Sequence, residues 1–413
     1  MAKKQDTKFE QTKSRFRLMG KINKLDVTNE RCYRKGVTRN GDNYESLKFS
    51  IQTSSTNSVP VEIFGMERDK VYFYSNGDKK TERVDFSKRN KVKLPYHYNL
   101  IGVQLRSKDE DAKLKDSINE LIEKQKDKCK TDEDKKRLLH SVLSKTNLVE
   151  YYVSANADRM KVNLTKTFVE LDAIHYIIEN FNNGDDVYVE GTMNVNSYTS
   201  QDGEARINMQ YQFNKILSAK EIDFEAEDFK EMASFEFQGM MVDTYDDDEN
   251  KDKLNVELRQ FQYGDKYEDF TFILDGERFP KMKKGFKTRL KFGDVIDVKG
   301  NIKNQIVLEE IKEENPFDDD FNWGGEDPNG FSKQNAIEYT VTELEITNFD
   351  PTNYTEGGKG KYKEEDFIAD INPFADDSND SNEDTFDDGG GEAGEDFDFD
   401  GIGIDINDDD LPF

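Results

Sequence analysis

The chain has 413 residues, a net charge of −28 and two cysteines, Cys32 and Cys129. This length allows two or three domains. Two widely separated cysteines exclude a disulfide framework and a cysteine-based zinc finger, and they are typical of a reducing cytoplasm. No stretch approaches the roughly 18 apolar residues of a membrane span, and the N-terminus lacks the apolar core of a signal peptide. We therefore expect no membrane partner.

The charge is distributed unevenly along the chain. Residues 1–100 carry 22 Lys and Arg against 12 Asp and Glu, whereas residues 316–413 carry 4 against 30. The overall pI near 4.6 therefore describes mainly the C-terminal quarter. The N-terminal block is basic enough to favour nucleic-acid contact, which the whole-chain charge would have excluded.

Residues 1–13 are polar and predict a flexible N-terminus. Alternating patterns predict strands over 14–27, 45–53 and 59–66, and residues 31–44 have the composition of a basic loop. A short helix over 169–181 and a hairpin over 187–216 follow a long insertion at about 67–168. Three strands, a helix and two strands are the order of an OB-fold, a five-stranded Greek-key barrel, so we expect a mainly β protein with an OB-fold domain at 14–220.

The insertion predicts both a hairpin and helices. Asn76-Gly77 between two apolar runs is a strong β-hairpin signal. Leu114, Ile118 and Ile122 lie on one helical face, and Thr131 before three acids predicts the N-cap of a second helix. Further strands are expected over 96–105, 148–155 and 160–164. Core packing explains the apolar helical faces as well as a partner-binding role does.

A second β domain, OB-like, is expected over 232–349. Its strands are predicted at 234–245, 253–263, 269–274, 294–302, 306–311 and 339–347. From residue 350 to 413 the chain is acidic with scattered Phe and cannot bury enough apolar surface to offset ordering entropy. We expect a disordered acidic C-terminal tail there.

Three short segments carry a family resemblance. They are Phe16–Ile22, Val61-Glu-Ile-Phe64-Gly65, and Asp186-Val-Tyr-Val-Glu-Gly191 followed by Tyr198 and Asp202-Gly203. In order and spacing they resemble the first, third and fourth strands of the bacterial single-stranded DNA-binding protein family. The resemblance implies that Phe64 and Tyr198 stack on bases. The chain departs from the family in lacking its tryptophans, since Ser58 stands where one is expected. The long insertion also puts the family's tetramer in doubt.

A groove for a single strand needs cations along the phosphates and aromatic faces for the bases. The N-terminal half interleaves both kinds of side chain. The candidate DNA-binding residues are Arg15, Arg17, Lys21, Lys24, Arg31, Tyr33, Arg34, Lys35, Arg39, Lys48, Phe64, Tyr72, Tyr74, Tyr96, Tyr98 and Tyr198.

The C-terminus forms a second candidate site, for protein partners. It reads Asp408-Asp409-Asp410-Leu411-Pro412-Phe413 and closely resembles the C-terminal peptide of the same family. The Phe413 ring suits an apolar pocket, its carboxylate suits a basic side chain, and Pro412 limits the entropy lost on docking. The resemblance implies recruitment of replication and recombination proteins such as a polymerase, primase, helicase or nuclease. The charge distribution also predicts that the tail competes with DNA for the basic groove.

Nothing in the sequence predicts catalysis. His97, His140 and His175 share no metal-ligand spacing, and no phosphate-binding glycine loop is present. We expect no enzyme activity and no cofactor. Two other interpretations stay open: an acidic DNA mimic that sequesters host nucleic-acid-binding proteins, and a carboxylate-metal nuclease. The insertion and the Lys- and Asn-rich composition suggest a bacteriophage protein acting in the bacterial cytoplasm during replication, recombination and repair.

Overall fold

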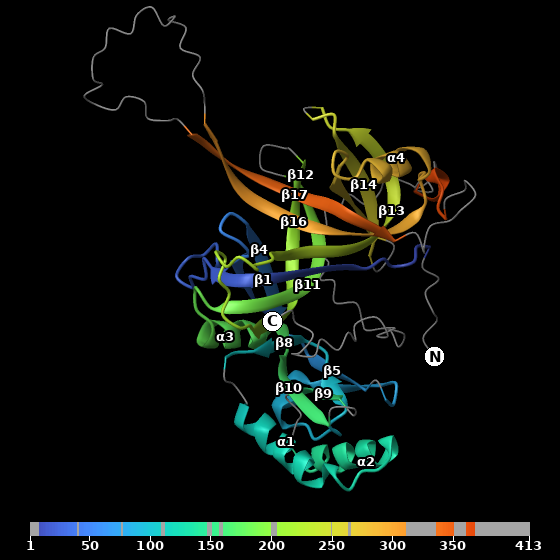
Figure 1. Cartoon of the computed structure of the whole chain (residues 1–413). Helices are drawn as coiled ribbons and strands as arrows, with labels where there is room; N and C mark the ends of the chain where they lie inside the picture. Colours follow the sequence, from blue (N-terminus) through green and yellow to red (C-terminus); the bar gives the residue numbers. More distant parts are fainter. Residues whose placement is uncertain are drawn as a thin grey trace, which may run out of the picture.

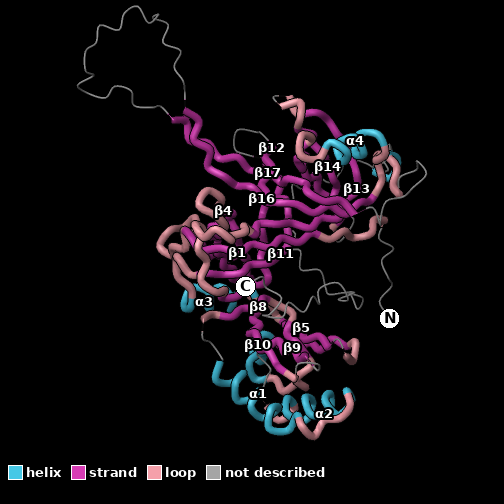
Figure 2. The backbone as a smooth tube through the Cα atoms, viewed as in Figure 1, coloured by secondary structure: helices cyan, strands magenta, loops and turns pink. Residues whose placement is uncertain are grey.

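Strands dominate the chain, and most of them belong to one sheet that curls into two barrels (Figure 1, Figure 2). The computed structural model describes residues 8–367 except 39–40, 76, 109–111, 147–150, 157–159, 200–204, 249, 263–265, 311–335 and 351–360. Within these residues no helix is long and apolar enough to cross a membrane. The number of strands in this sheet confirms the mainly β fold predicted from the sequence.

The first barrel is the predicted OB-fold. Its strands are β1 (Ser14–Asn23), β3 (Asn43–Gln52), β4 (Ser58–Met66), β11 (Asp186–Thr199) and β12 (Ala205–Ser218). Strand β1 pairs antiparallel with β3 and β11, β3 with β4, and β11 with β12. A parallel contact between Glu62 of β4 and Gln212 of β12 closes the ring. Helix α3 (Glu170–Asn180) lies in the chain between β4 and β11.

Alternation along the strands explains why this barrel forms. On β1 the side chains of Phe16, Leu18 and Ile22 are buried, while Arg15 and Arg17 point outward. Gly65 at the end of β4 allows α3 to approach, since a Cβ there would lie 2.6 Å from the Leu171 backbone nitrogen. The periodicity thus places an apolar interior against one face of the helix.

The second barrel repeats the first. Its elements are β13 (Met232–Asp246), β14 (Lys253–Phe261), β15 (Tyr267–Asp275), α4 (Pro280–Thr288), β16 (Val295–Glu310) and β17 (Ala336–Asp350). Strand β13 pairs with β14 and β16, β14 with β15, β16 with β17, and β15 meets β17 in parallel. This is again the OB-fold order, as expected. Helix α4 was not predicted, and the two strands expected over 294–311 form the single strand β16.

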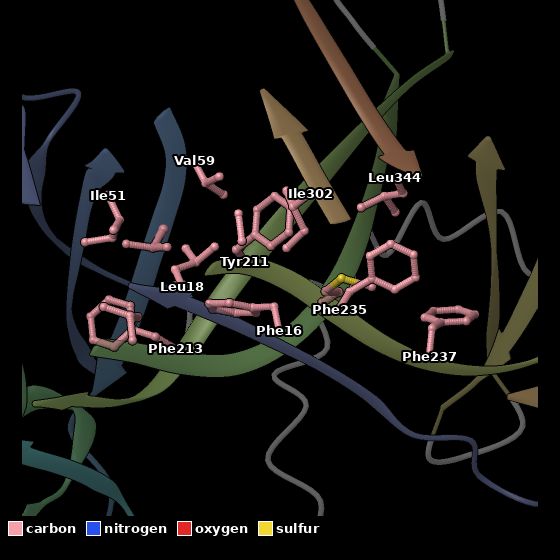
Figure 3. Close-up of a cluster of buried hydrophobic side chains, with 14 of the residues drawn as sticks. Phe16, Leu18, Ile51, Val59, Tyr211, Phe213, Phe235, Phe237, Ile302 and Leu344 are labelled. Atoms are coloured by element: carbon pink, nitrogen blue, oxygen red, sulfur yellow. The ribbon is translucent and has the colours of Figure 1, made fainter. Parts of the chain in front are cut away.

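The two barrels are joined through their first strands. Strand β1 pairs antiparallel with β13, and the register places Phe16 opposite Phe235. One hydrophobic cluster runs through both barrels, as Figure 3 shows for ten labelled side chains including Phe16, Phe235 and Tyr211. The ring of Tyr211 meets that of Phe16 edge-on at 5.4 Å. The barrels therefore share a core as well as a sheet.

A buried polar contact reinforces this joint. The Asn57 side chain, 1% exposed, donates to Glu231 Oε1 at 2.7 Å and to the Ile302 carbonyl at 2.9 Å. Its Oδ1 accepts the Asn304 backbone N–H at 2.7 Å. Asn57 belongs to the turn between β3 and β4, whereas Ile302 and Asn304 belong to β16. These bonds therefore tie the first barrel to the second.

The insertion lies between β4 and α3 and forms two parts. One is a small sheet of β5 (Lys70–Ser75), β6 (Lys80–Asp85) and β7 (Tyr98–Leu100), with a 3₁₀ helix at Phe86–Lys91. The other comprises β8 (Val103–Arg106), α1 (Ala112–Lys126), α2 (Asp132–Leu143), β9 (Tyr151–Asn156) and β10 (Lys161–Phe168). The predicted hairpin and both helices are present, and Thr131 caps α2 in a capping box. Strand β8 pairs with β12, so the insertion extends the sheet of the first barrel.

Two segments differ from the sequence-based expectations. The expected basic loop at 31–44 contains strand β2 (Tyr33–Val37), which pairs with β3. Residues 361–367, inside the range assigned to the tail, pack on the second barrel together with Phe9 of the N-terminal segment. Buried aromatic rings hold both segments there, which local composition does not reveal.

We predict that Asn57→Ala lowers the free energy of unfolding by about 2–3 kcal/mol, because it leaves the buried Ile302 carbonyl and Asn304 N–H without a partner. Chemical denaturation followed by fluorescence measures this loss. Asn43→Ala is the matched control, because Asn43 makes an exposed bond to Glu67. Its effect should stay within about 0.5 kcal/mol. Equal effects of the two variants would contradict the role given to Asn57.

Candidate nucleic-acid interface

The outer face of β2, β3 and β4 brings together several of the predicted DNA-binding residues. Arg34 of β2 is paired with Ser46 of β3, which is paired with Phe64 of β4. Paired residues in an antiparallel sheet point to the same side. Lys48 lies two residues beyond Ser46 and so shares that side. Arg34, Lys48 and Phe64 therefore form one face, which we call the β2–β4 face.

An aromatic pair, the exposed Phe64 and the half-buried Tyr44, lies on the β2–β4 face. Phe64 is 48% exposed although its ring is large and apolar. It stacks on the ring of Tyr44 with centroids 5.4 Å apart and planes 26° apart. Gly36 of β2 lies directly under Tyr44, because a Cβ there would lie 2.5 Å from the tyrosine oxygen. Packing on Gly36 and Phe64 holds Tyr44 in place, so the face offers a preorganised surface for stacking.

A polar row crosses the same face. Lys48 Nζ lies 3.6 Å from Glu62 Oε2, and Glu62 is the residue at which β4 meets Gln212 of β12. Asn194 of β11 donates to Gln212 Oε1 at 2.9 Å. Burial raises the pKa of the Glu62 carboxyl, and the attraction to Lys48 offsets only part of this. The row thus offers one lysine and two amides beside a carboxylate whose pKa is raised.

Tyr33 and Lys35 lie on the opposite side of β2. The Tyr33 hydroxyl donates to Glu45 at 2.7 Å, and Lys35 and His175 lie 3.1 and 2.9 Å from the same carboxylate. Burial by itself would raise the pKa of Glu45, but hydrogen bonds from Tyr33, His175 and Lys35 outweigh it and lower that pKa. Tyr33 and Lys35 are therefore engaged at the end of the barrel near α3, away from Phe64.

The cations of β1 form ion pairs on another outer face. Arg15 lies 2.7 Å from Glu190, and Arg17 lies 3.3 Å from Glu236 across the joint between the barrels. Lys21 pairs with Asp186 at 2.8 Å. Burial opposes ionisation of Glu190, but Lys215 and the bond from Arg15 outweigh it and lower its pKa. The side chains of Arg15 and Arg17 are only 20% and 26% exposed, so β1 contributes to the joint more than to a groove.

The remaining candidates are scattered. Lys24 and Arg31 are exposed near the end of β1 and before β2. Tyr72 and Tyr74 are half-buried on β5, where the Arg83 guanidinium lies 5.6 Å from the Tyr72 ring. Tyr98, in contrast, is buried in the core of the small insertion sheet.

Other predicted positions are half-buried or not described. Tyr96 is half-buried and packs against the core under α1 and α2. Arg39 and the tip residues 408–413 lie outside the described residues. For Tyr198 only the backbone pairing with Arg206 in the β11–β12 hairpin is described.

The second barrel lacks an aromatic residue where the first has Phe64. Glu62 and Ile273 are equivalent, because each makes the parallel contact that closes its barrel, so Asp275 takes the place of Phe64. Asp275 is paired with Lys253 and accepts the backbone N–H groups of Glu277 and Arg278. The corresponding face of the second barrel therefore presents a carboxylate in place of a ring.

Sequence reasoning missed Tyr44 and Glu62 on the β2–β4 face, and Gln212 and Asn194 in the polar row beside it. Tyr44 could have been found from its period-two spacing with Lys48 on β3. Glu62 and Gln212 could not, because their neighbourhood depends on the parallel closure of the barrel. Among the described residues no group of three His, Cys, Asp or Glu side chains could hold a metal ion.

Solved structures similar to this chain include single-stranded DNA-binding proteins. The wild-type protein from Thermus aquaticus is 9% identical, with a TM-score of 0.33, over 86% of this chain and 98% of that chain. A deletion mutant of that protein is 10% identical, with a TM-score of 0.30, over 82% of this chain and 94% of its own. A small single-stranded DNA-binding protein from Mycoplasma pneumoniae is 14% identical, with a TM-score of 0.17, over 29% and 93%.

A comparison with family models identifies the family of the chain. No curated protein matches it. The model of the YorF family matches residues 98–383, from the small insertion sheet through the second barrel and into the acidic segment. This match covers more than half of the 413 residues. The chain therefore belongs to the YorF family.

Proposed function

We propose that this protein binds single-stranded DNA without strong sequence preference, through the β2–β4 face of the first barrel. The observation that carries the proposal is the half-exposed Phe64 ring, which is stacked on Tyr44 and shares one face of the sheet with Arg34 and Lys48. Stacking accepts any base because every base has an aromatic face, and cations beside the rings neutralise the phosphates. Such binding protects unpaired strands during replication, recombination and repair.

The tail supplies the second half of the proposed function. Asp408, Asp409, Asp410, Leu411, Pro412 and Phe413 suit a basic pocket with an apolar floor on a partner protein. We propose that a polymerase, primase, helicase or nuclease is recruited in this way. The bacteriophage origin and the bacterial cytoplasm expected from the sequence stay predictions, as does the absence of enzyme activity.

An acidic DNA mimic is the alternative function. Binding of single-stranded DNA distinguishes it from the proposed function. The mimic hypothesis does not explain an aromatic pair that shares a face with cations. It predicts no binding to oligothymidine. The proposed function predicts tight binding to oligothymidine that weakens steeply with salt, and weak binding to duplex.

Phe64→Ala should lower the affinity for labelled oligothymidine by roughly tenfold or more, since stacking contributes about 1–3 kcal/mol per base. Fluorescence anisotropy at several salt concentrations measures this change. The salt dependence should stay as in the parent chain, because no cation is removed. Phe64→Tyr keeps an aromatic face and is the control that should retain most of the affinity. Unchanged binding by Phe64→Ala would refute the assignment of this face.

Glu62→Gln should strengthen strand binding severalfold at low salt, because it removes a negative charge beside Lys48 and the expected phosphates. In the parent chain protonation of Glu62 has the same effect. Affinity should therefore rise as the pH falls through the raised pKa of Glu62, and Glu62→Gln should flatten this rise. Titrations with oligothymidine across mildly acidic pH test both statements. Identical pH profiles for the two proteins would show that Glu62 does not face the strand.

Phe413→Ala should abolish capture of a purified replication partner while leaving the affinity for oligothymidine unchanged. The ring is the apolar anchor in the proposed pocket, so its loss removes most of the binding energy. Surface plasmon resonance with candidate helicase, primase and polymerase measures the interaction. Asn407→Ala, just before the acidic run, serves as control. A partner that binds both variants equally would rule out the tip as its ligand.

A further inference from the structure

Helix α4 carries the main basic surface of the otherwise acidic second barrel. Lys283 and Lys287 are held by Asp246 at 3.4 and 2.6 Å. Lys281, Lys284 and Lys291 are exposed, and no carboxylate of the described chain lies within ion-pair distance of their side chains. We call these three residues, together with the exposed Arg289, the α4 basic surface.

The equivalent helix of the first barrel has the opposite charge. Helix α3 begins with Glu170 and Asp172 and has no basic residue in its last turn. The OB framework therefore does not require lysines at this position. The exposed lysines of the α4 basic surface repel one another, and this repulsion lowers the stability of the folded state. An acidic ligand would remove the repulsion, so this surface suits an acidic ligand.

The root of the acidic tail is fixed beside α4. The backbone N–H of Tyr362 donates to the Gly293 carbonyl at 3.2 Å, and a Cβ on Gly293 would collide with the Tyr362 carbonyl oxygen at 1.8 Å. The Phe367 ring stacks on Phe9 at 5.0 Å and meets Phe292 edge-on at 6.0 Å. Gly293 and Phe292 directly follow Lys291. Figure 1 shows residues 361–367 at the second barrel, whose helix α4 ends five residues before Gly293, whereas β4 belongs to the first barrel.

The chain beyond Phe367 has the charge and length to reach the α4 basic surface. Residues 368–413 contain 17 Asp and Glu and no Lys or Arg. A random coil of 46 residues has an end-to-end distance of about 35–40 Å, and the α4 basic surface lies well within that reach of Phe367. Tethering so close raises the effective concentration of acidic residues at α4 above that at the distant β2–β4 face.

We propose that the acidic tail docks on the α4 basic surface of its own second barrel and leaves the β2–β4 face open. This assigns the tail a resting site other than the DNA groove that the charge distribution suggested. The contact is electrostatic, so salt releases the tail. A partner protein that takes the tip then pulls the tail from α4 without disturbing a bound strand.

Energy transfer within the full-length chain tests this docking. A dye pair joins Thr288→Cys on α4 to Ser381→Cys in the tail, and a second pair joins Ser46→Cys on the β2–β4 face to the same tail position, both with Cys129→Ser. At low salt the transfer should be high for the first pair and low for the second. Lys281→Glu with Lys284→Glu should reduce the first transfer about twofold, as should roughly 1 M salt. The matched control combines Lys128→Glu, in the turn between α1 and α2, with Lys136→Glu on α2; it makes the same charge change and should have no effect.

Three outcomes would overturn the proposal. Higher transfer for the Ser46 pair places the tail on the DNA face. Transfer from α4 that does not respond to the Lys281 and Lys284 reversals, or responds equally to the control, removes the α4 basic surface as the cause. The third outcome comes from the affinity of the Lys281 and Lys284 variants for oligothymidine. A loss equal to that of Arg34→Glu assigns α4 to DNA, whereas unchanged affinity with reduced transfer supports docking of the tail. The energy-transfer results do not depend on whether Phe64 binds bases.

Discussion

The pairing of β1 with β13 is the contact on which the arrangement of the two barrels depends. Its register has Phe16 opposite Phe235, and these two residues are equivalent because each is paired with the glycine of a bulge, Gly191 or Gly300. The joint is therefore a pseudo-two-fold axis within one chain. Its charges are complementary, since Arg17 meets Glu236. Two copies of β1 paired in the same register would instead place Arg15 opposite Arg17, and like charges in that position destabilise a sheet.

Around this axis the two barrels keep one framework and diverge in their surfaces. Both have a glycine at the end of the third strand, yet the residue before it is an exposed Phe64 in one barrel and a hydrogen-bonded Asp275 in the other. Their helices differ in the same way, α3 being acidic and α4 basic. Packing constrains the buried residues of a shared fold, whereas its surface residues can differ with function. We infer that the two barrels bind different ligands: single-stranded DNA on the first barrel and the acidic tail on the second.

Much of the fold could be predicted because local signals were strong. Alternation located the strands, Thr131 located the start of α2, and Asn76-Gly77 located the β5–β6 hairpin. Strand β2 was missed because an edge strand of polar residues has no apolar alternation, and its pairing with β3 stabilises it. Helix α4 was missed because it buries only one residue, Phe286, so its sequence carries little helical periodicity. Of the candidate site, Arg34, Lys48 and Phe64 share a face, while most of the other candidates proved to be paired, buried or remote.

The sequence by itself determined the order of the elements, the basic and acidic ends of the chain, and the aromatic residue at position 64, since periodicity and composition are local properties. Only the tertiary structure decided which cations remain available. Arg15 is a cation like Arg34, but the carboxylate of Glu190 comes from a distant part of the chain and holds it. It also decided that residues 362 and 367 anchor the tail on the second barrel. Such pairings depend on contacts between segments far apart in the chain, and no local pattern encodes them.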